Sequence, residues 1–125
     1  MKMRILLLIM FIHNSVATVN KHMFSNVDRV NFLFNIIDNN PKDNYLYYNE
    51  LYIFQKTTEP NEALQLTPEI YIYLTRLFGA NPRKGLTLQE FNSSYYQHSY
   101  ELGTDLNRDF NIIFDFIYKY YRRLI

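Results

Sequence analysis

The chain has 125 residues, with 13 basic and 12 acidic side chains, a formal net charge of +1 and no cysteine. This length suits one domain, the balanced charge gives no electrostatic footprint for nucleic acid, and the missing cysteines exclude disulfides and thiolate chemistry. Apolar residues make up 48% of the chain and aromatic residues 18%, with only three Gly and four Pro, so an ordered all-α domain is expected.

The first 17 residues are typical of a secretory signal peptide. Two basic residues precede an uncharged run over residues 5–12, and Ser15 and Ala17 have the spacing that a signal peptidase recognises. The run is too short to span a bilayer. We therefore expect cleavage after Ala17 and a secreted, extracellular mature chain, residues 18–125, that forms one domain without a membrane segment.

The first predicted helix spans about residues 25–38. Ser25 followed three positions later by Asp28 is a helix-start pattern. The helix should end near Asp38, because the residue before Pro41 avoids helical geometry. Apolar residues recur at helical spacing between these points and define the face expected to be buried: Val27, Val30, Leu33, Phe34 and Ile37.

An oxygen-rich stretch, residues 38–45, separates this helix from the next. It is followed by aliphatic Leu46, and four positions later Glu50 opens a second apolar run that contains Leu51 and is expected to end near Lys56. The same arrangement recurs 40 residues further on, where Leu86 precedes Glu90 by four positions. The chain therefore contains two similar units, each with a helix, a loop and a helix.

This pair of units resembles the EF-hand superfamily over about residues 25–100. The resemblance implies paired EF-hand-like helix-loop-helix units in which Leu46 and Leu86 meet in a short antiparallel contact, and it implies calcium as the cofactor. A twelve-residue loop ending at Glu50 would place Pro41, which has no side-chain oxygen, at a ligand position. A thirteen-residue loop instead implies five metal ligands: Asp38, Asn40, Asp43, the carbonyl of Tyr45, and Glu50.

Two features limit this metal assignment. The second loop has no acidic residue between Phe78 and Leu86 and carries Arg83 and Lys84, whose charges would repel a cation, so we expect it to bind nothing. Glu90 also completes a plain capping box with Thr87, which needs no metal. An ordinary polar loop between helices likewise remains an alternative for the first loop.

Three more helices are predicted after residue 66. The third begins at Thr67-Pro68, the fourth continues to about Leu102, and the last runs over about residues 105–123. The last helix is an additional C-terminal amphipathic helix, which the groove between the helix pairs can receive. The expected buried faces are Ile70, Leu74, Leu77 and Phe78 on the third helix, Leu88, Phe91, Tyr95, His98 and Leu102 on the fourth, and Leu106, Phe110, Ile113, Phe114, Ile117, Tyr121 and Leu124 on the last.

These patterns predict a secreted EF-hand-like calcium-binding protein with at most one weak structural site. The alternative is a metal-free secreted interaction or matrix protein that keeps the helical fold and uses its tyrosine-rich surface for a protein partner. A third interpretation is a carrier that holds an apolar ligand among its aromatic helices. No catalytic arrangement stands out, so enzymatic activity is not expected. Asn92-Ser93-Ser94 is a glycosylation sequon that secretion would expose to modification.

Overall fold

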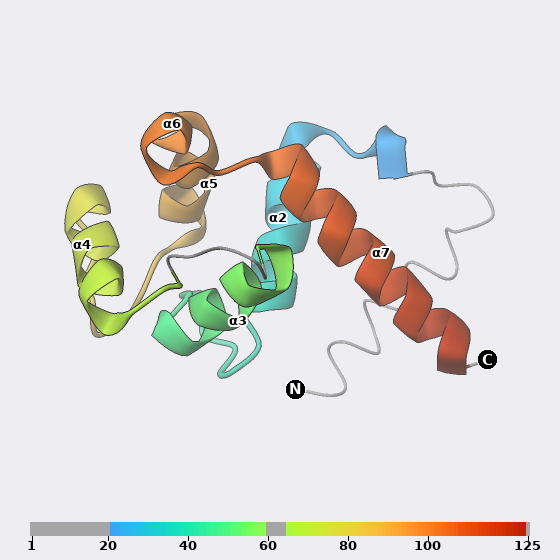
Figure 1. Ribbon diagram of the computed structural model, residues 1–125, viewed down its shortest axis with the longest axis horizontal. Coiled ribbons are helices and arrows are strands. Elements are labelled where there is room, and N and C mark those ends of the chain that lie inside the picture. Colours follow the sequence, from blue (N-terminus) through green and yellow to red (C-terminus); the bar gives the residue numbers. More distant parts are fainter. Residues whose placement is uncertain (1–20, 60–64, 125) are drawn as a thin grey trace.

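The computed structural model describes residues 21–59 and 65–124, and within them the fold is all-α (Figure 1). The expected signal peptide lies outside these residues. A short 3₁₀ helix and six α-helices follow one another along the described chain: η1 (Lys21–Met23), α2 (Asn26–Ile37), α3 (Tyr48–Thr58), α4 (Pro68–Phe78), α5 (Leu88–Tyr96), α6 (Ser99–Leu102) and α7 (Leu106–Leu124). None of the described helices combines the length and apolar character that a membrane span requires.

The predicted helix starts are confirmed by local hydrogen bonds. The Ser25 side chain accepts from the backbone N–H of Asp28, and the Asp28 carboxylate accepts from the N–H of Ser25, which is a capping box for α2. Thr87 forms the same kind of capping box with Glu90 at the start of α5, and at the start of α4 the Thr67 side chain accepts from the N–H of Ile70. Each cap satisfies backbone donors that have no partner within the helix.

Helix α7 packs mainly against α2 and α3, and it begins beside α2 (Figure 1). Phe32 on α2 and Phe110 and Phe114 on α7 form an aromatic cluster with ring centroids 5.5–6.0 Å apart. Val27 was expected in the buried face of α2 but is 67% exposed. That prediction is wrong because Phe24, which precedes the helix, covers the cluster at this end, with its ring 5.2 Å from that of Phe110.

The two loops meet through one short antiparallel bridge, so the predicted contact between Leu46 and Leu86 is confirmed. The Leu46 N–H donates to the Leu86 carbonyl at 2.8 Å, and the Leu86 N–H donates to the Leu46 carbonyl at 2.9 Å. Both side chains are buried. Gly85 lies against this bridge with a φ of 108°, and a Cβ there would collide with the Leu46 carbonyl. The bridge thus requires glycine beside it.

The fourth predicted helix ends earlier than expected. Helix α5 stops at Tyr96, and the short α6 replaces the continuation to Leu102. A continuing helix would bond the His98 N–H to the Ser94 carbonyl, but the Thr104 hydroxyl donates to that carbonyl at 2.6 Å, and the His98 N–H turns to the Ser93 carbonyl. The α-helical hydrogen-bond pattern therefore ends where Thr104 donates to the Ser94 carbonyl.

Helix α4 buries a different face from the one its sequence suggests. Tyr71 and Thr75 are buried, whereas Ile70, Leu74, Leu77 and Phe78 are only half-buried. The Tyr71 hydroxyl donates to the Pro82 carbonyl at 2.7 Å and so holds the second loop. Burial of its ring raises the pKa of Tyr71 to about 12. The side of α4 that carries Tyr71 therefore packs against the second loop.

Replacing Gly85 with alanine should destabilise the protein more than the same change at Gly79. Both glycines have positive φ, which costs about 1–2 kcal/mol for another residue, but only at Gly85 does a Cβ also collide with backbone. We expect Gly85→Ala to lose about 3 kcal/mol or more of unfolding free energy, measured by urea denaturation. Equal losses at the two glycines would contradict a structural role for the bridge.

Candidate metal centre

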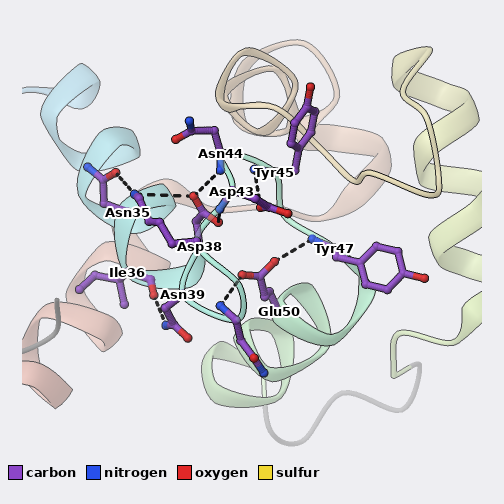
Figure 2. A network of polar contacts seen from close by, with 11 residues as sticks. Asn35, Ile36, Asp38, Asn39, Asp43, Asn44, Tyr45, Tyr47 and Glu50 are labelled. Atoms are coloured by element: carbon purple, nitrogen blue, oxygen red, sulfur yellow. Dashed lines mark hydrogen bonds and ion pairs between the residues drawn. The ribbon is translucent and has the colours of Figure 1, made fainter. Parts of the chain in front are cut away.

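Three carboxylates converge where the first loop joins its two helices. Asp38 ends α2, Asp43 lies in the loop and Glu50 lies in the first turn of α3 (Figure 2). One oxygen from each carboxylate lies within 4.8 Å of the others. Asp38 is 0% exposed and Glu50 is 4% exposed, whereas Asp43 is open to solvent. The loop therefore gathers three acidic members of the predicted ligand set into one group.

Asp38 organises the turn at the centre of the loop. Its Oδ1 accepts from the Asp43 N–H at 3.1 Å and its Oδ2 accepts from the Asn44 N–H at 2.9 Å (Figure 2). Asn44 has a φ of 67°, a left-handed conformation that asparagine tolerates better than most residues. The Asp43 carboxylate in turn accepts from the Tyr45 N–H at 3.0 Å. Each aspartate is thus oriented by the backbone that follows it.

Glu50 links the beginning of α3 to the beginning of the loop. Its Oε1 accepts from the Tyr47 N–H and its Oε2 from the Asn40 N–H, both at 2.9 Å. The Asn49 side-chain amide donates to the Asn40 carbonyl at 3.2 Å. The first turn of α3 therefore holds Asn40 by both its N–H and its carbonyl, and this fixes the distance between Glu50 and the aspartates.

Asn40 and Tyr45, the other two predicted ligands, take part in this network through their backbone. Asn40 donates its N–H to Glu50, and Tyr45 donates its N–H to Asp43. The Tyr45 ring lies 5.8 Å from the ammonium nitrogen of Lys84 in the second loop. The sequence reasoning missed Asn49, although its place directly before Glu50 in the first helical turn was a signal that it reaches the loop.

The electrostatics of the group favour a cation. Burial raises the pKa of Asp38 and of Glu50 above their ordinary values, and the backbone donors oppose this rise only in part. The neighbouring charge of Asp43 raises both pKa values further. Lys42 supplies one positive charge, with its Nζ 3.6 Å from Asp38 Oδ2. Within the first loop, three carboxylates and one ammonium leave net negative charge, which a divalent cation would neutralise. Arg83 and Lys84 of the second loop border the same hollow as Asp43 and offset part of this charge.

The donor set suits a hard cation, because carboxylate oxygens are the ligands that calcium and magnesium prefer. The second loop has no such group of carboxylates, because Glu90 is its only acidic residue after Phe78. Its Asn81 side chain accepts from the Arg83 N–H, and its Glu90 carboxylate accepts from the N–H and the hydroxyl of Thr87. Arg83 and Lys84 are exposed. The capping box is formed as predicted at this position.

No protein-family model, curated protein or solved structure matches this chain. Its class is therefore defined by the fold and the site alone. It is an all-α protein in which two loops are joined by one β-bridge and one of them carries a group of three carboxylates that can hold a metal ion.

Without a divalent cation, the acidic group should make stability fall as pH rises. The pKa of Asp38 and of Glu50 is raised above the ordinary 3.8 and 4.5, so the folded state binds protons more tightly than the unfolded state. The unfolding free energy then decreases as the pH rises from the ordinary pKa values of the unfolded state to the higher pKa values of the folded state. We expect Asp38→Asn/Glu50→Gln to flatten this decrease.

Urea denaturation in chelator, between about pH 4 and about pH 7, tests this prediction. The buried Asp109 also has a raised pKa but is present in both proteins, so its contribution cancels in the comparison. Parallel stability profiles for the wild type and the double variant would show that the carboxylates of the first loop do not carry this pH dependence.

Proposed function

We propose that this protein is a secreted, EF-hand-like calcium-binding protein whose first loop holds one structural cation. The observation that carries the proposal is the convergence of Asp38, Asp43 and Glu50 within 4.8 Å at the junction of α2 and α3. Two of the three carboxylates are buried with raised pKa values, and a calcium ion would relieve the cost of their charges.

The correspondence between the two units supports the EF-hand-like assignment. In the first unit the Tyr47 N–H donates to Glu50 at 2.9 Å, and in the second the Thr87 N–H donates to Glu90 at 2.8 Å. Each donor directly follows one of the two bridging leucines. Both loops therefore end with the same geometry, which is what a pair of related helix-loop-helix units would have.

The acidic content of the loops supports a single site. The first loop brings three carboxylates together, whereas the only carboxylate at the end of the second, that of Glu90, caps α5. Extracellular sites of this kind bind calcium with dissociation constants on the order of 10⁻⁴ to 10⁻³ M. The proposed extracellular location rests on the signal-peptide pattern of residues 1–17. In that setting the ion would stabilise the fold rather than switch it.

A metal-free secreted interaction or matrix protein is the second candidate, and specific contacts favour it. Asp38 already accepts two backbone N–H groups and pairs with Lys42, so the loop can hold its shape without an ion. Several aromatic side chains also point outward and offer a surface to a protein partner: Tyr73, Tyr96, Tyr100, Phe116 and Tyr120. In this second candidate function the helical fold is the same, and the protein binds a protein partner instead of an ion.

Calcium should raise the melting temperature of the wild type, and Glu50→Gln should abolish the rise. For a dissociation constant of about 1 mM, about 10 mM calcium adds roughly 1.4 kcal/mol of stability. In a domain of this size that corresponds to a rise of several degrees. Thermal unfolding followed by circular dichroism, in calcium and then in chelator, measures the effect.

Glu90→Gln is the matched control for this experiment. It makes the same change at the same helix position of the second unit, so it can weaken a cap without touching the acidic group. We expect Glu90→Gln to melt earlier than the wild type in both conditions but to keep the calcium-induced rise. Identical melts of the wild type with calcium and with chelator would refute the calcium proposal, and self-association of that protein would then favour the second candidate.

A further inference from the structure

A cavity of about 190 Å³, partly open to solvent, is lined mainly by α3, α4 and α5, with Arg108 and Asp109 of α7 at one end, and it lies away from the acidic group. One wall is formed by the half-buried side of α4, through Ile70, Leu74 and Phe78, three of the four residues that the sequence predicted to be buried. The side chains that line the cavity are mainly aliphatic and aromatic, among them Leu51, Phe54, Ile70, Leu74, Phe78 and Phe91. Because the apolar face of α4 borders this cavity, the protein buries that face only in part.

The uncharged polar side chains in the wall are already engaged within the protein. Thr58 donates its hydroxyl to the Phe54 carbonyl at 3.0 Å, and Ser94 donates its hydroxyl to the Phe91 carbonyl at 2.5 Å. The Gln55 side-chain oxygen accepts from the Leu66 N–H at 2.5 Å. A ligand with a hydroxyl or amide group would have to compete with these bonds.

The charged residues at one end of the cavity are also paired with one another, one arginine with two carboxylates. The Tyr95 hydroxyl donates to Asp109 Oδ2 at 2.7 Å, and Arg108 donates to Asp109 Oδ1 at 3.1 Å and to Glu59 at 2.5 Å. This network joins α5 and α7 to the end of α3. A charged ligand would lose its hydration without gaining a free counter-charge.

We propose that this cavity binds a small, uncharged aromatic hydrocarbon or a compact alkane of similar size. An apolar cavity of about 150 Å³ suffices to bind benzene, so 190 Å³ accommodates benzene with one or two methyl groups. Binding would complete the burial of the α4 face, which supplies the driving force. This activity is independent of the proposed calcium site, because none of Asp38, Asp43 and Glu50 lines the cavity.

Toluene and phenol, which are nearly equal in size, form the test pair. Calorimetric titration of the full-length protein, in chelator, should give saturable toluene binding that also raises the melting temperature. Phenol should bind at least about tenfold more weakly, because its hydroxyl would be buried without a free partner. Failure of the calcium experiment would leave this result unaffected.

Two variants test whether toluene binds in this cavity. Leu74→Phe fills part of the cavity and should weaken toluene binding, whereas Leu88→Phe makes the same change at an exposed leucine and should leave toluene binding unchanged. The proposal is overturned if the folded wild type does not bind toluene, if phenol binds as tightly, or if folded Leu74→Phe binds toluene like the wild type. The comparison of toluene with phenol keeps the proposal testable even if Leu74→Phe does not fold.

Discussion

The arrangement of this protein depends on two main-chain hydrogen bonds between Leu46 and Leu86. They join loops that lie 40 residues apart, and they hold both leucine side chains in the core. Such a bridge is too short to be stable alone, so it persists because both sides are buried and because Gly85 lets the backbones approach. Helices α3 and α5 begin directly after the bridging segments, and their starting points are set by it.

The acidic group is a consequence of this constraint. Glu50 lies one helical turn after Leu46, and it reaches back to the Asn40 N–H at the start of the loop, close to Asp38 at the end of α2. Burial of like charges at this point opposes folding, and it is tolerated because backbone donors and Lys42 compensate in part. A site of this kind could hold a cation, and the backbone donors that already orient its carboxylates fit the weak structural role that we propose for calcium.

The apolar cavity arises from the same bridge on its other side, since Leu86 belongs both to the bridge and to the cavity wall. Helix α7 packs mainly on α2 and α3, and its first turn is linked to α5 by the hydrogen bond between Tyr95 and Asp109. Helix α4 lies on the side of the molecule away from α7 (Figure 1), and its half-buried face borders the cavity. The proposed ion and the proposed hydrocarbon would use separate, chemically opposite parts of one small helical domain.

The sequence alone determined the features that are completed within a few residues: the helix starts at Ser25, Thr67 and Thr87, and the acidic spacing of the first loop. These are predictable because a cap or a turn finds its partners three or four positions away. The EF-hand resemblance, which the repeat of Leu46 in Leu86 carries in part, also implied the bridge. Only the tertiary structure decided that α5 ends where Thr104 donates to the Ser94 carbonyl, that Asn49 supports Asn40, and that α4 buries Tyr71 while its aliphatic face borders a cavity. Each of these outcomes depends on a contact between residues that are distant in the chain or lie on different elements. The pattern of residues within a few positions contains no information about which of these contacts will form.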